Sequence, residues 1–151
     1  MFIKDTITRG FVAGIMAGVL MNIVSYISFY LNIASLRFLD WPSIIITGHS
    51  PANTLSALYF LLVQLIFVGF LGSIFALLIT RVTTSMNHLF KGFLFGVISW
   101  FTIYGLTYLA DVPKLTPLDM GTAVTDFIGA IVFGIVLAES LNKLDTKYDL
   151  L

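Results

Sequence analysis

The sequence contains no cysteine, which excludes disulfide bonds, thiolate zinc sites, iron–sulfur ligation and a cysteine nucleophile. Charged residues are also scarce, because Asp, Glu, Lys and Arg make up 11% of the 151 residues and the formal net charge is zero. The chain therefore has no basic field that would attract nucleic acid, and no long Lys/Arg run that would form a strong patch on anionic lipid.

Motifs of enzyme chemistry are missing as well. The sequence has no phosphate-binding nucleotide loop, no His-Glu-x-x-His and no Gly-x-Ser-x-Gly. Its two histidines, His49 and His88, fall on opposite sides of the membrane in the topology described below, so they cannot ligate one haem or one metal ion. We therefore expect a protein without enzymatic activity, cofactor or metal site.

Apolar residues are abundant instead. They make up 58% of the chain, and the mean hydropathy of +1.00 lies far above that of soluble domains. Apolar runs of membrane length cover about residues 10–31, 53–80, 88–110 and 118–141. The fold class predicted from these runs is an all-α polytopic membrane protein with four transmembrane helices.

A shorter piece lies between the first two spans. It begins at Asp40 and Pro42, residues that suit a helix start, and it reaches Gly48, which can stop a helix. It is too short to cross a membrane, so we expect a short interfacial helix with Trp41 as its anchor at the membrane surface.

The distribution of basic residues predicts the orientation of the spans. Six of the eight Lys and Arg residues lie near span ends on one side, while Arg37 and Lys114 lie on the other; the six are Lys4, Arg9, Arg81, Lys91, Lys143 and Lys147. Both termini are therefore expected in the cytoplasm, with the chain in the cell (inner) membrane.

An internal repeat is visible in the glycine positions. The segment Arg9-Gly10-Phe11 matches Lys91-Gly92-Phe93, and setting Gly72 against Gly134 pairs Gln64 with Asp126 and Ala76 with Ala138. We interpret the chain as a single transmembrane domain over residues 1–151 that contains two tandem helical hairpins, repeat 1 at about 9–80 and repeat 2 at about 91–141. Each hairpin begins on the same side, so the repeat is parallel.

The paired glycine-rich helix starts, the Asp-x-Pro turns at Asp40 and Asp111, and the Thr-Asp-Phe-Ile-Gly opening of the last span resemble a known group. They are similar to small four-helix inner-membrane proteins of bacteria of the YagU or YqhR kind. The resemblance covers most of the chain and implies the fold alone, because such families have no settled activity.

Small residues recur every four positions in several spans, which allows helix backbones to approach closely in lipid. This predicted packing seam comprises Gly10, Gly14, Gly18, Gly72, Gly92, Gly96, Ala130, Gly134 and Ala138. Spacing alone leaves open whether these faces contact helices of the same chain or of another protomer.

Polar residues inside the spans form the predicted intramembrane polar cluster of Asn22, Gln64 and Asp126, with Tyr104 as a further member. Counting about 1.5 Å per residue places Asp126 on the order of 12 Å deep and Gln64 about 16 Å. An unpaired carboxylate at that depth costs several kcal/mol. We expect Asp126 to be protonated, to be hydrogen-bonded by Gln64, Asn22 or Tyr104, or to be compensated by a group outside the chain.

Two functional hypotheses follow. In the first, the chain is a non-enzymatic accessory or scaffold subunit that packs through its glycine-rich faces in a larger membrane assembly. In the second, it is a small homo-oligomeric channel or proton/cation-coupled carrier that uses Asp126. The expected partners are membrane lipid and either other membrane subunits or further copies of the chain, and not nucleic acid.

Overall fold

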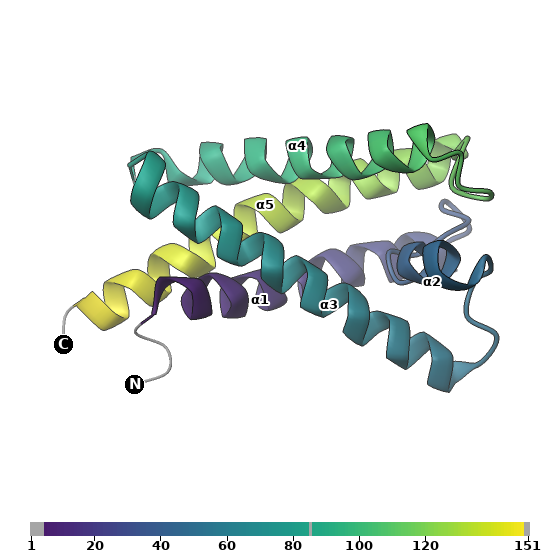
Figure 1. Ribbon diagram of the computed structural model, residues 1–151, viewed down its shortest axis with the longest axis horizontal. Helices are drawn as coiled ribbons and strands as arrows, with labels where there is room; N and C mark the ends of the chain where they lie inside the picture. Colours follow the sequence, from purple (N-terminus) through teal and green to yellow (C-terminus); the bar gives the residue numbers. More distant parts are fainter. Residues whose placement is uncertain (1–4, 85, 150–151) are drawn as a thin grey trace.

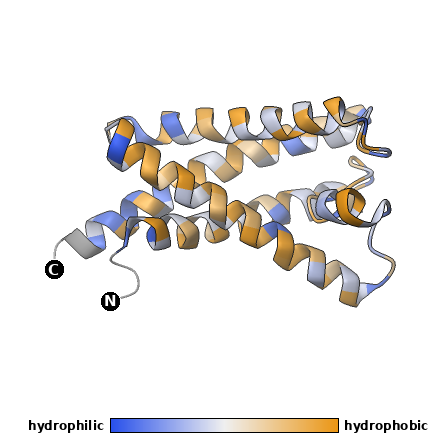
Figure 2. Cartoon of the chain, in the orientation of Figure 1, coloured by the Kyte–Doolittle hydropathy of each residue, from blue (hydrophilic) through white to orange (hydrophobic). Residues whose placement is uncertain are grey.

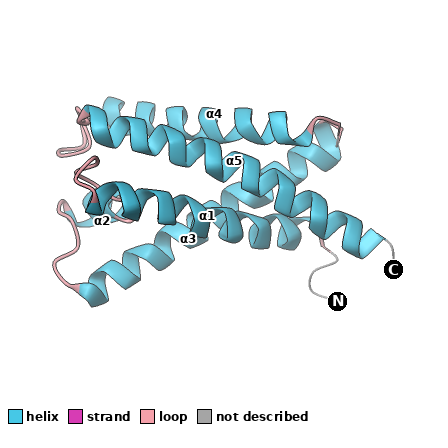
Figure 3. Ribbon diagram, turned by 180° about the vertical axis from the view of Figure 1, so that it is seen from behind, coloured by secondary structure: helices cyan, strands magenta, loops and turns pink. Residues whose placement is uncertain are grey.

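The computed structural model describes residues 5–84 and 86–149, so Lys4, one of the residues in the orientation count, lies outside it. The helices are α1 (Thr6–Tyr30), α2 (Asp40–Thr47), α3 (Thr54–Leu77), α4 (His88–Leu109) and α5 (Met120–Asp149), and α3 ends in a π-helical turn, η2 (Leu78–Val82). The described residues form no strand (Figure 3). Four segments are long and apolar enough to cross a membrane, so the prediction of an all-helical polytopic fold is confirmed.

The bundle is built around α1 and α5, which pack against each other; α3 packs on α1, and α4 packs on α5 (Figure 1). The beginning of α1 and the end of α5 lie at one end, which we name the near end. The segments that connect α1 to α3 and α4 to α5 lie at the opposite end, the far end. Apolar residues dominate the helices, and hydrophilic ones gather toward their ends, as expected of spans in lipid (Figure 2).

The interface between α1 and α3 is made of glycines in direct backbone contact. A Cβ atom at Gly10 would lie 2.5 Å from the carbonyl oxygen of Gly72, and one at Gly72 would lie 2.2 Å from the carbonyl oxygen of Gly10. Gly14 is equally confined, since its Cβ would lie 2.4 Å from the oxygen of Val68. Any side chain at these positions would push the two helices apart.

The interface between α4 and α5 has the same pattern of contacts. A Cβ at Gly92 would lie 2.2 Å from the oxygen of Gly134, and one at Gly96 would lie 2.2 Å from the oxygen of Ala130. The next small residue along each partner helix, Ala76 or Ala138, also meets the first glycine of its seam. All the glycine-rich faces therefore contact helices of the same chain and are not free to bind another one.

The central α1–α5 contact joins the two hairpins. Ala13 and Ala17 of α1 are fully buried in a core that also contains Phe133 and Leu137 of α5. Near the end of α5, Asp145 forms an ion pair with Arg9 of α1, with 2.9 Å between Oδ1 and Nε. The charged residues after position 141, beyond the predicted fourth span, thus continue the α5 helix, which packs on α1.

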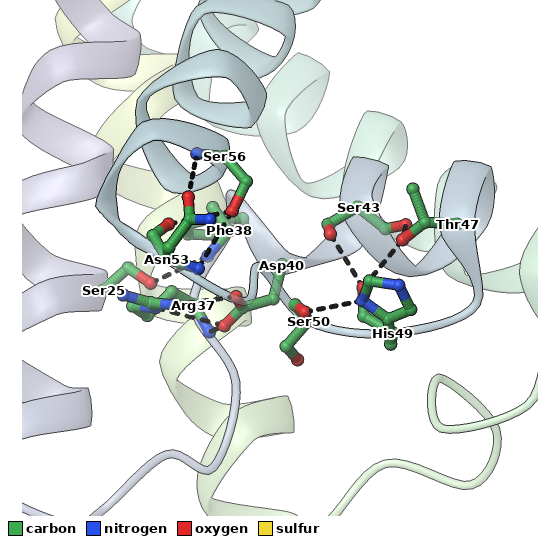
Figure 4. A network of polar contacts seen from close by, with 10 residues as sticks. All are labelled: Ser25, Arg37, Phe38, Asp40, Ser43, Thr47, His49, Ser50, Asn53 and Ser56. Atoms are coloured by element: carbon green, nitrogen blue, oxygen red, sulfur yellow. Dashed lines mark hydrogen bonds and ion pairs between the residues drawn. The ribbon is translucent and has the colours of Figure 1, made fainter.

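Side chains cap most helix starts. The carboxylate of Asp5 accepts from the backbone N–H of Thr8 at the start of α1. Asn53 and Ser56 form a reciprocal capping box at the start of α3 (Figure 4). Gly48 ends α2 with a φ of +79°, the left-handed conformation that glycine adopts without strain.

The expected role of Trp41 is wrong. Its side chain is only 8% exposed and packs with Ile44 and Leu115, whereas Ile45 and Ile46 form the exposed face of α2. The sequence suggested a surface anchor because Trp often lies at the membrane interface. Trp41 is buried instead, because α2 turns this side chain toward α4 and α5, where it fills the space between the two hairpins.

The glycine seams yield the first prediction. Gly72→Ala should destabilise the bundle by about 1–3 kcal/mol, because the new methyl group meets backbone and cannot be accommodated by a rotamer change. Thermal unfolding in detergent, followed by circular dichroism, measures the loss. The matched control is Gly105→Ala in α4, where a Cβ meets nothing within 4 Å. That variant should be neutral or slightly stabilising, and equal destabilisation by both substitutions would contradict the packing described.

Candidate functional site

The side chain of Asp126 is completely buried in the far half of α5. Neither of its carboxyl oxygens has a hydrogen-bond partner. The indole of Trp41 approaches this carboxyl, yet its Nε1 makes no hydrogen bond of proper geometry. A buried unpaired polar group costs about 1–3 kcal/mol, so the incomplete hydrogen bonding of this pair destabilises the far half of the bundle.

Asn22 and Gln64 form a separate pair between α1 and α3. The Asn22 side-chain amide donates to Gln64 Oε1 at 2.7 Å and to the carbonyl oxygen of Gly18 at 2.8 Å. Both residues are buried, and neither bonds to Asp126. The structure therefore brings together only two of the four residues of the predicted polar cluster.

Tyr104 belongs to a third group. Its ring stacks on that of Trp100, with 6.0 Å between centroids and 7° between planes, and it packs beside the cluster of Trp41, Ile44 and Leu115. Tyr104 contacts these neighbours through its aromatic ring. The predicted polar cluster rested on the depth of each residue in the membrane, and depth does not specify the helix face on which a residue lies.

A hydrogen-bonded clasp at the far end was missed by sequence reasoning. Ser35 donates its hydroxyl to the carboxylate of Asp119 and its backbone N–H to Thr122 Oγ1, the latter at 2.9 Å. Asp119 also caps α5, accepting from Thr122 N at 2.9 Å and from Thr122 Oγ1 at 2.7 Å. Gly121 allows the close approach, since a Cβ there would lie 1.7 Å from the oxygen of Ile33. The clasp holds the 31–39 segment against the start of α5.

Further hydroxyl groups continue from the clasp into the bundle and form a polar layer with it. Ser28 of α1 and Thr125 of α5 share a hydrogen bond of 2.5 Å, and Ser25 accepts from the backbone N–H of Phe38 at 3.1 Å. Ser25, Ser28 and Thr125 are buried, and Thr125 directly precedes Asp126 in the sequence. The spacing of Thr122, Thr125 and Asp126 along one helix face was the signal that could have indicated the layer.

Arg37 and Asp40 form the main ion pair of the far end (Figure 4). The Asp40 carboxylate, 2% exposed, accepts from the Arg37 backbone N–H at 2.7 Å and from its guanidinium at 3.0 Å. The guanidinium also lies over the rings of Phe29, at 4.9 Å, and Tyr26, at 5.6 Å. Arg37 therefore has its charge neutralised within the chain.

Two hollows flank α3 from its middle toward the far end. The first, which we name the α3–α4 cavity, has a volume of about 270 Å³; the second, the α1–α3 groove, has a volume of about 550 Å³. Gln64 lines the cavity and Asn22 lines the groove. Their hydrogen bond thus forms part of the wall between the two hollows, at the point where α3 diverges from α1 toward the far end (Figure 1).

The chemistry available to this region is hydrogen bonding and apolar contact. Within residues 5–84 and 86–149 there is no group of three or more His, Cys, Asp or Glu side chains that could hold a metal ion. The indoles of Trp41 and Trp100 and the amide of Asn22, which line the hollows, have unused hydrogen-bonding capacity, as does the buried carboxyl of Asp126. A partner or ligand would therefore be recognised mainly by shape and by few polar contacts.

Comparison with known proteins identifies one family. The family described as conserved membrane protein YqhR matches residues 1–147 of the chain, in agreement with the resemblance seen in the sequence. No curated protein and no solved structure matches the chain.

The clasp yields the second prediction. Hydrogen bonds from Ser35 and then from Thr122 hold the pKa of Asp119 below its ordinary value of 3.8. A group whose pKa is lower in the folded state stabilises the fold fully above its unfolded pKa and loses that contribution as the pH falls through the folded pKa. Unfolding temperatures should therefore be steady above about pH 4 and fall below it, because a protonated Asp119 accepts fewer hydrogen bonds.

Asp119→Asn separates this effect from other acid-sensitive groups. The variant should unfold at a lower temperature than the wild type at pH 7, and the difference should shrink below pH 4, where the wild-type carboxylate becomes protonated. A constant difference at every pH would contradict the assignment of the acid sensitivity to this clasp.

Proposed function

The chain belongs to the YqhR family of conserved membrane proteins, and on that premise we propose that it is a non-enzymatic accessory or scaffold subunit of a larger membrane assembly. The surface that binds its partner is the α1–α3 groove. This differs from the surface expected from the sequence, because the glycine-rich faces already pack within the chain.

The observation behind this proposal is the shape and lining of the α1–α3 groove. It is open along the side of the bundle, has a volume of about 550 Å³ and is lined almost entirely by apolar and tyrosine side chains. Tyr30 is 73% exposed and Ile27 55% exposed at its far end. Such a lateral concavity between two spans suits a neighbouring apolar helix, which packs by dispersion contacts in lipid.

Asn22 adds a polar feature to the groove. Its side-chain nitrogen donates two hydrogen bonds within the chain, but its Oδ1 has no hydrogen-bond partner. An interhelical hydrogen bond in a membrane contributes about 0.6–2 kcal/mol, so a Ser, Thr or Asn on a partner helix would gain from meeting this amide. The groove thereby offers both apolar area and one point of specificity.

The proposed orientation places both termini in the cytoplasm and the chain in the cell (inner) membrane. The number of spans and the position of the ends support a common side, because α1 begins and α5 ends at the near end. Basic residues at this end include Arg9, Arg81, Lys91 and Lys143, and the positive-inside rule assigns such an end to the cytoplasm.

Site-specific photocrosslinking in native membranes tests the accessory role. A photoreactive phenylalanine at Leu61, which lines the groove, should give one discrete adduct heavier than the chain itself. The same residue at Ile98, 61% exposed on α4 and outside both hollows, is the matched control and should give no such adduct. Equal labelling at both positions, or none at Leu61, would contradict the proposal; an adduct of two copies would indicate a homo-oligomer.

The second candidate function is a homo-oligomeric channel or proton/cation-coupled carrier that uses Asp126. The observation that favours it is the buried carboxyl without a hydrogen-bond partner, since ionisable groups inside membranes often belong to proton or ion pathways. Asp126 does not line either hollow, so the carrier requires a rearrangement or an additional subunit to open a path to it.

Substitution of Asp126 separates the two candidates. For an accessory subunit, Asp126→Asn should fold and assemble normally, and Asp126→Leu should raise the free energy of unfolding by about 1–3 kcal/mol, because an unpaired buried polar group is removed. Thermal unfolding and proton or cation flux in proteoliposomes are measured in parallel. A folded Asp126→Asn protein that has lost a flux present in the wild type would instead support the carrier.

A further inference from the structure

The α3–α4 cavity lies in the far half of the bundle and is lined by all five helices. The rings of Phe75 and Phe95, tilted by 50° with 5.1 Å between centroids, bring α3 and α4 together nearer the near end. The two helices then diverge toward the far end (Figure 1). Trp41, Phe67, Trp100 and Phe133 contribute aromatic surface to the walls. The cavity therefore opens sideways between two helices that each cross the membrane.

The exposed rim faces the lipid. Ile46 of α2 is 61% exposed and Phe67 of α3 is 45% exposed, and both line the cavity. Because α3 and α4 are spans, the medium outside this rim is the hydrocarbon of the bilayer. Lipid chains can enter the cavity by lateral diffusion without passing through water.

Two other occupants fit poorly. Water needs two to four polar partners, and a cavity with apolar walls such as these provides almost none. A transmembrane helix is about 10–12 Å across with its side chains, which is too wide for a volume of about 270 Å³. A slender apolar chain satisfies both limits.

We propose that the α3–α4 cavity is a binding site for one hydrocarbon chain of a membrane lipid. An apolar protein cavity of about 150 Å³ takes up one benzene molecule, so the volume of about 270 Å³ here accommodates roughly ten carbon atoms of a chain. The chain completes dispersion contacts that the walls of an empty cavity would lack. This inference is independent of the accessory role, which uses the opposite side of α3.

The aromatic walls provide a direct readout. Trp41 and Trp100 are the two tryptophans of the chain, and both line this cavity. Bromine atoms on a lipid chain quench indole fluorescence only at contact distance. Both emitting side chains therefore border the cavity, and the buried Trp41 reports on its occupancy more selectively than the half-buried Trp100.

The experiment uses the full chain in bilayers made of phosphatidylcholine with or without bromine in the middle of the acyl chains. A chain in van der Waals contact with both indoles, at about 3.5–4.0 Å between atoms, should remove roughly half or more of the emission. The variants Trp41→Phe and Trp100→Phe assign the loss to each ring. Trp41 is the sharper probe, since its side chain is 8% exposed and can be reached through the cavity.

Filling the cavity provides the matched control. Val63→Phe on α3 and Ser99→Phe on α4 occupy the site from opposite walls and should each restore much of the emission in brominated bilayers. Val19→Phe, the same change in the α1–α3 groove, should leave the quenching at the wild-type level. Circular dichroism and gel filtration confirm that each variant is folded.

Two results would overturn the proposal. Quenching that is absent in the wild type, or unchanged in both filled variants, would mean that no lipid chain occupies the cavity.

Discussion

Direct backbone contact between helices is the constraint on which the rest of this structure depends. In lipid there is little hydrophobic drive for helices to associate, so close approach and dispersion contacts must hold them together. Gly10 against Gly72 and Gly92 against Gly134 provide that approach at the near half of each hairpin. Toward the far end α3 diverges from α1 and α4 (Figure 1), and the two hollows lie beside α3.

The far half is held by polar contacts instead. The Asn22–Gln64 bond lies where α3 leaves α1, the Ser35–Asp119–Thr122 clasp fixes the connection after α1 to the start of α5, and Arg37 neutralises Asp40 beside them. Asp126 is the exception in this region, because it is buried without a hydrogen bond. The near half is tightly packed, whereas the far half contains the hollows and is held together by polar contacts. This contrast explains why the candidate binding surfaces lie toward the far end.

The fold class and the family could be predicted from the sequence, because both depend on patterns that are visible in the sequence itself. Long apolar runs separated by Pro-containing turns specify spans, and the glycine spacing on paired helices specifies which faces approach closely. Spacing did not reveal whether the partner of each glycine lies in the same chain. In the structure it does, because Gly72 contacts Gly10 and Gly134 contacts Gly92. The site was harder to predict, because depth in the membrane grouped Tyr104 and Asp126 with Asn22 although they lie on different faces. Trp41 was misassigned because its residue type suits an interface and only the path of α2 buries it.

The most direct test of this account is the distance between glycines of neighbouring helices within one chain. Solid-state NMR of glycine-labelled protein in bilayers should show contacts between Gly14 and Gly72 and between Gly96 and Gly134. These contacts should keep their intensity per labelled molecule when the labelled protein is diluted with unlabelled protein, because each pair belongs to a single chain. Contacts that are missing, or that disappear on dilution, would show that the seams lie elsewhere or join separate copies, and would contradict the account.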